Sequence, residues 1–166
     1  MPNIYDPDFD EPRRTVDGFH ALRARLGQQL GTERVGLSQW EVGPGQAAYP
    51  YHFHLAEEEV LVVLDGRPAL RTPAGWRRLE RGEVVRFAPG EDGAHQLAND
   101  TEETVRLLAI STHGQPDIVL YPDEGKVGPA ERRSDGSGFK QYYNLKDAVP
   151  YDHGIVAPEI GHVDPA

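Results

Sequence analysis

The sequence contains no cysteine among its 166 residues. Disulfide bonds and thiolate metal ligands are therefore excluded. Basic residues are also few, with 17 Lys and Arg against 27 Asp and Glu, which gives a formal net charge of −10. A chain of this charge is a poor partner for nucleic acid, because the phosphate backbone binds Lys and Arg.

Long apolar runs are missing as well, and the longest is far shorter than a membrane span. Residues 1–12 are acidic and proline-rich, and they lack the basic start and apolar stretch of a signal peptide. We therefore expect a cytoplasmic protein that does not enter a membrane. The motifs His-Glu-x-x-His, Cys-x-x-Cys, Gly-x-x-x-x-Gly-Lys and Gly-x-Ser-x-Gly are all absent, so the sites that they mark are not indicated.

Turn-forming residues are abundant, with 18 Gly and 14 Pro. They favour many short strands over a helical bundle, and the length suits one domain with a hydrophobic core. The expected strands are Val35–Val42, Tyr51–His54, Glu59–Leu64, Arg67–Thr72, Trp76–Leu79, Val84–Ala88, His95–Ala98, Val105–Ser111 and Ile118–Tyr121. Turn signals separate these runs, so the pattern predicts an all-β sandwich or barrel over residues 35–121.

The segment before this barrel, residues 1–34, is expected to form an extended N-terminal arm that packs on it. Residues 17–31 are ambiguous within that arm. Apolar residues from Phe19 to Leu30 have roughly helical spacing, with Gly31 as a C-cap, whereas the alternation from Leu22 to Leu26 is typical of a strand. We favour the strand.

The segment after the barrel, residues 122–166, is expected to form an irregular C-terminal extension. Residues 122–138 are polar and rich in turn signals, which predicts a surface loop. Residues 139–145 contain enough aromatic side chains to dock back on the barrel. Residues 150–166 are predicted to be a wrapped or loose tail.

The run Glu59–Leu64 is apolar on both faces of the predicted strand. If Glu59 faces inward, positions 61 and 63 do so too, and Val60, Val62 and Leu64 face outward. A strand that is apolar on both faces is normally covered on both sides. Either the N-terminal segment or a second subunit must then pack outside it, and we expect a homodimer.

Histidines suggest where chemistry takes place. His52 and His54 are one residue apart on a predicted strand, so their side chains point the same way. Glu59 opens the next strand, the chain turns back at Asp65-Gly66, and His95 follows later. We expect short hairpins to bring three imidazoles and one carboxylate together as a divalent-metal site.

The spacing of these residues resembles the two sequence motifs of the cupin superfamily. The matching positions are Gly45, His52, His54, Glu59 and Gly66 in the first motif, and Gly82, Pro89, Gly90, Gly93, His95 and Asn99 in the second. The first spacer is one residue longer than usual, and the interval from Pro to Gly in the second motif is longer than its minimal form. Over its wider pattern the chain resembles uncharacterised bacterial single-domain cupins, some of which are labelled sugar-phosphate isomerases by analogy.

The resemblance implies a double-stranded β-helix, the cupin or jelly-roll barrel, with His52, His54, Glu59 and His95 as metal ligands. The six residues between Glu59 and Gly66 select Glu59 as the carboxylate, so its two glutamate neighbours are expected to be solvated. Such ligands suit one divalent ion such as Zn, Fe, Mn or Ni. An octahedral ion would keep two positions open for water or substrate.

Three further residues are candidates for the pocket lining. Tyr49 and Tyr51 flank the first histidines, and either they line the pocket or they pack against a neighbouring strand. Arg86 would pair with an anionic substrate if it faces inward, and otherwise it is an ordinary outward charge. No catalytic residue is assigned.

These features predict a metalloenzyme that acts on a small oxygenated metabolite by isomerase, lyase or dioxygenase chemistry. The alternative is a cupin that binds a small ligand without turnover. An acid or base beside the metal would distinguish the two, and the sequence does not plainly supply one.

Overall fold

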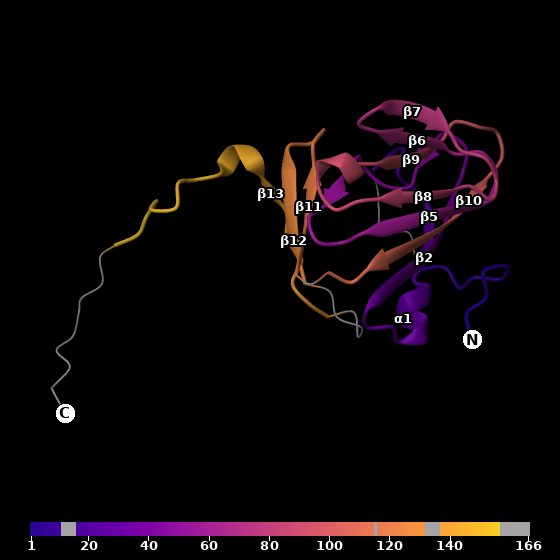
Figure 1. Ribbon diagram of the computed structural model, residues 1–166, viewed down its shortest axis with the longest axis horizontal. Helices are drawn as coiled ribbons and strands as arrows, with labels where there is room; N and C mark the ends of the chain where they lie inside the picture. Colours follow the sequence, from indigo (N-terminus) through magenta and orange to yellow (C-terminus); the bar gives the residue numbers. More distant parts are fainter. Residues whose placement is uncertain (11–15, 115, 132–136, 157–166) are drawn as a thin grey trace.

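Antiparallel strands dominate the computed structural model, which describes residues 1–10, 16–114, 116–131 and 137–156 (Figure 1). The strands are β1 (Leu22–Ala24), β2 (Val35–Val42), β3 (Gln46–Ala47), β4 (Phe53–His54), β5 (Glu59–Asp65), β6 (Ala69–Thr72), β7 (Gly75–Arg78), β8 (Val84–Phe87), β9 (Gln96–Asn99), β10 (Val105–Thr112), β11 (Asp117–Tyr121), β12 (Lys126–Ala130) and β13 (Tyr143–Asn144). The helical pieces are α1 (Leu26–Leu30) and the 3₁₀ turns η1 (Glu91–Gly93) and η2 (Leu145–Asp147). The expected all-β class is confirmed.

The strands form three sheets that close around a common interior. Their orders are β1-β2-β10-β5-β8, β3-β9-β6-β7 and β13-β12-β11-β4. Figure 1 shows β11 and β12 standing across one end of the long strands β2, β10, β5 and β8, with β6, β7 and β9 above them. This is the double-stranded β-helix that the sequence predicted.

The core lies on the inner faces of these sheets. Leu61 and Val63 on β5, Leu107 on β10 and Leu97 on β9 are at most 1% exposed. Since side chains alternate along a strand, burial of positions 61 and 63 turns Glu59 inward as well. The predicted inward face of β5 is therefore correct.

The ambiguous N-terminal segment contains both a strand and a helix. Leu22–Ala24 pair with β2 as an edge strand, so the strand prediction is right there. Leu26–Leu30 form a short helix, and Gly31 ends it in the left-handed conformation at φ 70°. Both elements pack against β2.

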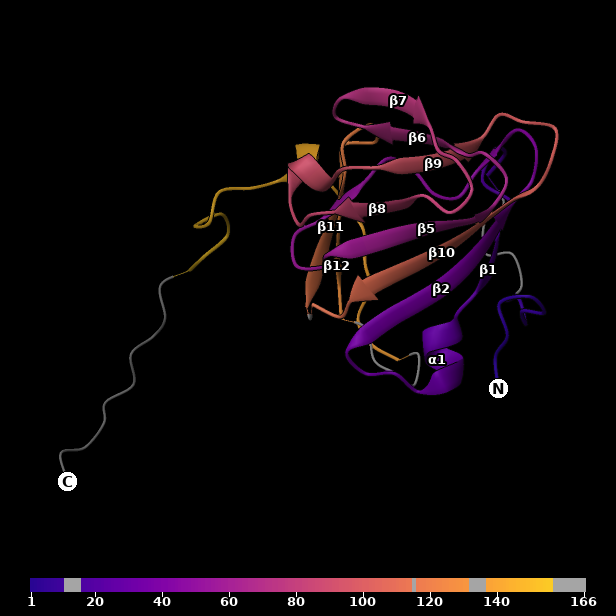
Figure 2. The same ribbon diagram turned by 45° about the vertical axis from the view of Figure 1, so that its right-hand side comes forward.

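The outer face of β5 is not covered by these N-terminal elements. Val60 and Val62 are only half-buried there. In Figure 2 the outer side of β10, β5 and β8 faces the viewer, and no part of the described chain crosses it.

The C-terminal extension is more ordered than predicted. Strand β12 lies within residues 122–138, for which the sequence predicted only a surface loop, and it pairs with β11 over five residues. Gly128 and Pro129 do not favour a sheet, so the sequence of this segment does not predict a strand. The strand forms because the segment pairs with the edge of β11. Residues 139–145 dock through β13 as expected, although Tyr142 and Tyr143 remain about half exposed.

Beyond η2 the chain leaves the body of the molecule, as Figure 1 shows. Residues 150–156 are exposed, in line with the predicted loose tail, and residues 157–166 lie outside the described residues. In the ranges that the structure describes, no helix is long and apolar enough to cross a membrane.

Candidate metal centre

The two histidine-bearing segments are joined at the histidines themselves. The backbone N–H of His52 donates to the carbonyl of His95 at 3.1 Å, and the N–H of His95 donates to the carbonyl of His52 at 2.8 Å. His54, two residues further, pairs with Val119 where β4 meets β11. Strand alternation therefore turns the rings of His52 and His54 to one side, with 5.1 Å between their centroids.

Glu59 completes the group from the first position of β5. Its Oε2 atom lies 3.3 Å from Nε2 of His95 and 3.7 Å from Nε2 of His54. Ligand atoms of His52, His54 and Glu59 all lie within 4.8 Å of one another. The structure thus brings His52, His54 and Glu59 together as a group that could hold a metal ion. His95 lies beside this group through its contact with Glu59.

All three imidazoles use Nδ1 for a hydrogen bond to an oxygen. Nδ1–H of His52 donates to the Pro50 carbonyl at 3.0 Å, and Nδ1–H of His95 donates to the Gly93 carbonyl at 2.9 Å. Because a carbonyl oxygen can only accept, the proton of a neutral ring sits on Nδ1 and leaves Nε2 with its lone pair. His54 has the same arrangement, with a carboxylate of Asp117 at 2.5 Å in place of a carbonyl.

The carboxylate of Glu59 also suits a bound cation. Its Oε2 atom is buried and accepts no hydrogen bond from the described residues. A buried carboxylate oxygen without a partner is costly, and a cation placed between it and the Nε2 atoms would satisfy it. Three nitrogen donors and one oxygen donor are a set that zinc, iron, manganese and nickel accept. The residues therefore fit a divalent metal.

Their surroundings shift the pKa values of His54 and His95 in opposite directions. Burial disfavours the charged form of His54, but the hydrogen bond to Asp117 and the charges of Glu59, Asp117 and Glu57 outweigh it and raise its pKa. Burial also acts on His95, where the opposing attraction of Glu59 is too weak, so its pKa is lowered. His95 is therefore held neutral, as a metal ligand must be.

Aromatic rings hold the histidines in place. Phe87 stacks on His95 with 3.7 Å between centroids and 5° between planes. Tyr49 contacts His52 and His95 edge-on at 4.8 and 5.5 Å, and Tyr121 stacks on His52 at 5.9 Å. The orientation of these imidazole rings is thus set by packing.

The group opens into a cavity of about 580 Å³, a size typical of small-molecule sites. All four candidate ligands line it, together with Trp40 and Tyr49. Arg23 from β1 and Lys140 from the C-terminal extension line it too. Segments before and after the barrel therefore both contribute walls.

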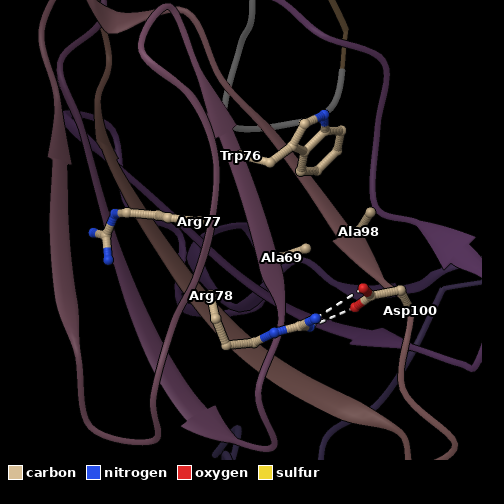
Figure 3. A pocket seen from close by; sticks show the side chains of 6 residues that line it. All are labelled: Ala69, Trp76, Arg77, Arg78, Ala98 and Asp100. Atoms are coloured by element: carbon tan, nitrogen blue, oxygen red, sulfur yellow. Dashed lines mark hydrogen bonds and ion pairs between the residues drawn. The ribbon is translucent and has the colours of Figure 1, made fainter.

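A second pocket of about 400 Å³ lies over β6, β7 and β9 (Figure 3). Its lining includes Trp76, Arg78 and Asp100, and the last two already form a bidentate ion pair. No histidine lines it. The candidate site is therefore the larger cavity.

Only one of the three predicted pocket residues lines that cavity. Tyr49 does, whereas Tyr51 is absent from the lining and the Arg71 guanidinium stacks on its ring at 4.0 Å. Arg86 is exposed and pairs with Glu58. Of the two orientations left open for Arg86, the structure shows the outward one, because Phe87, the next residue on β8, takes the inward position.

One prediction about the glutamates was also wrong. Glu58 is partly exposed as expected, but Glu57 is 1% exposed and lies 3.7 Å from Nδ1 of His54. It is therefore a buried neighbour of the site and not a solvated link residue. The prediction missed Asp117 and Tyr121 as well, and their only signal was a place beside the last apolar run.

Part of the chain matches a known family model. Residues 38–111 match the model of the cupin domain. These residues form a cupin domain. They contain all four candidate ligands, whereas Asp117 and Tyr121 lie just beyond the matched cupin region.

Solved cupin structures resemble a larger part of the chain. A protein named as a presumed sugar phosphate isomerase from Acidithiobacillus ferrooxidans is 27% identical, with a TM-score of 0.69, over 80% of this chain and 81% of its own. A cupin named as a sugar phosphate isomerase from Silicibacter pomeroyi is 19% identical, with a TM-score of 0.74, over 92% and 98%.

A predicted oxalate decarboxylase from Thermotoga maritima is 19% identical, with a TM-score of 0.52, over 64% and 90%. At 19% identity, the likenesses to the Silicibacter and Thermotoga proteins show the fold alone. The comparison with curated proteins finds no match.

Proposed function

We propose that this protein is a divalent-metal-dependent enzyme that acts on a small oxygenated metabolite. One observation carries the proposal: three imidazoles hold their protons on Nδ1, and the Nε2 atoms of His54 and His95 lie 3.7 and 3.3 Å from an unpartnered carboxylate oxygen of Glu59 beside a cavity of about 580 Å³. A structural metal site would be closed by its ligands, whereas this one opens into space for a second molecule.

A divalent ion bound by His52, His54, Glu59 and His95 would supply Lewis-acid chemistry at an oxygen of the substrate. The chain's own residues supply orientation and a proton. Burial, followed by the charge of Glu59, raises the pKa of the Tyr49 phenol well above its usual value. Tyr49 therefore stays protonated at neutral pH and can donate a hydrogen bond to a substrate oxygen in the cavity.

An isomerase reaction is the first candidate among the isomerase, lyase and dioxygenase types. The support is the protein from Acidithiobacillus ferrooxidans, which at 27% identity is named as a presumed sugar phosphate isomerase. Sugar phosphates are small and rich in oxygen, and Arg23 and Lys140 in the cavity wall suit an anionic group. We also propose a cytoplasmic location, which the absence of cysteine fits.

The test begins with metal content. Protein purified without chelator or nickel resin should contain close to one divalent ion per chain by elemental analysis. His54→Ala should lose it, whereas His20→Ala, which changes an exposed histidine outside the site, should keep it. Stoichiometric metal in His54→Ala would refute the ligand assignment.

Turnover is tested separately. The metal-loaded protein is incubated with sugar phosphates and small hydroxy acids, and the products are followed by NMR. Conversion that Tyr49→Phe slows while metal content is unchanged would support the proposal. Reversible binding without any chemical change would instead favour the non-catalytic ligand-binding cupin.

A further inference from the structure

We propose that Asp117 is the positioning residue of the metal centre, and that it makes His54 the ligand on which metal affinity most depends. This inference rests on the proposed metal function and extends it to a residue outside both cupin motifs. Asp117 opens β11, 63 residues after His54, and is completely buried.

Both oxygens of this carboxylate act on the metal-binding segment. Oδ2 accepts the hydrogen bond from Nδ1 of His54 at 2.5 Å, and Oδ1 accepts one from the backbone N–H of Ala56 at 3.1 Å. Ala56 belongs to the short link between His54 and Glu59. One side chain therefore fixes the ring of one ligand and the loop that leads to another.

His54 differs in this respect from the other two histidines. His52 and His95 donate to backbone carbonyls, which are neutral and which no substitution can remove. His54 donates to a carboxylate, whose negative charge makes the imidazole a stronger base and locks its tautomer with Nε2 free. The carboxylate–imidazole pair should thus strengthen one metal bond specifically.

A second cation beside His54 is the competing interpretation. Ligand atoms of His54, Glu57 and Asp117 lie within 4.8 Å of one another and could form a group of their own. However, Nδ1 and Oδ2 are 2.5 Å apart. Two ligands on one zinc ion, at about 2.0–2.2 Å each, are held about 3 Å or more apart. The short separation is that of a hydrogen bond, so we expect a single ion per chain.

The experiment compares Asp117→Asn with Glu57→Gln, a matched control that removes an equally buried charge near the same ring. Affinity for Zn²⁺ is measured by competition with a chromophoric chelator, and Co²⁺ is used to record the absorption spectrum of the site. Asp117→Asn should bind Zn²⁺ about 10–100-fold more weakly and shift the Co²⁺ bands. Glu57→Gln should change the affinity by less than about 3-fold, because its Oε2 lies 3.7 Å from Nδ1 of His54 and so is beyond hydrogen-bond distance of the ring.

A second measurement needs no metal and no variant. In the metal-free wild-type protein, at a pH where the ring is neutral, ¹⁵N chemical shifts of His54 should show its single proton on Nδ1. A neutral ring with its proton on Nε2 would overturn the inference, as would wild-type affinity in Asp117→Asn or two ions per wild-type chain. If the wild type binds no metal, the proposed function fails, whereas the tautomer of His54 still tests the role of Asp117.

Discussion

At the scale of single residues, His54 and His95 show how one site can hold the same side chain in two electrostatic states. Burial alone would lower the pKa of both. The pKa of His54 is nevertheless raised, because the Asp117 carboxylate accepts a hydrogen bond from its Nδ1. His95 instead has a carbonyl at Nδ1 and a phenyl ring stacked on its face. The difference lies in the partners and not in the residue type.

This contrast predicts two opposite effects of pH on the metal-free protein. The pKa of His95 is lowered, so its contribution to stability is present above the unfolded value of about 6.5 and is lost as pH falls through the folded value. The pKa of His54 is raised, so its contribution is present below about 6.5 and is lost as pH rises through the folded value. Melting temperatures of the apoprotein between pH 5 and 8 should therefore fall at both ends.

The variants separate these contributions. His95→Asn should flatten the acid side of the profile, and His54→Asn should flatten the alkaline side. An acid side as steep in His95→Asn as in the wild type would contradict the assignment to His95.

At the scale of elements, the turn before His95 depends on a close backbone approach. A Cβ on Gly93 would lie 1.8 Å from the carbonyl oxygen of Ala88, so no side chain fits there. Gly93 also supplies the carbonyl that accepts the hydrogen bond from His95. The loop through η1 thus sets the position of His95, because Gly93 packs against Ala88 at the start of the loop.

Gly93→Ala should therefore both destabilise the protein and weaken the metal site. The loop must shift to relieve the contact, at a cost of about 1–3 kcal/mol, and His95 should move with it. Chemical denaturation measures the first effect, and Zn²⁺ titration measures the second.

Gly43→Ala is the control, because Gly43 has no atom within 4 Å of the added carbon. Equal behaviour of the two variants would show that the contact at Gly93 is unimportant.

At the scale of the whole molecule, the barrel keeps an apolar outer surface on the sheet that carries β5. Register places Val84, Val62 and Leu108 side by side across β8, β5 and β10, and Val84 is 63% exposed. This is the face that the sequence predicted to be covered. Since the described N-terminal elements pack on β2 instead, we propose that a second copy of the chain covers it.

The dimer is tested by light scattering coupled to size-exclusion chromatography. The wild type should give twice the 18.4 kDa of one chain, and Val62→Lys should give the monomer mass. Ile118→Lys, which adds a charge at an exposed position of another sheet, should remain dimeric. A monomeric wild type at micromolar concentration would refute the proposal.

Local pattern was sufficient for much of this protein. Short apolar runs bounded by turn signals placed β2 from Val35 to Val42, and they placed β5 and β10 within one residue at their ends. The side-by-side geometry of His52 and His54 likewise follows from the pleat of a strand, which is a property of the backbone. Sequence alone therefore determined the β class, most strands and the four side chains that meet.

Tertiary structure decided what surrounds each candidate ligand, because those surroundings depend on which strands become neighbours. Asp117 reaches His54 only because β11 pairs with β4, and nothing near either residue indicates that pairing. Glu57 is buried and Arg86 is exposed for the same kind of reason, since the fold determines what covers each position. Motif spacing and the pleat of a strand can therefore locate the candidate metal ligands, whereas the groups that orient them come from strand pairings between residues far apart in the sequence.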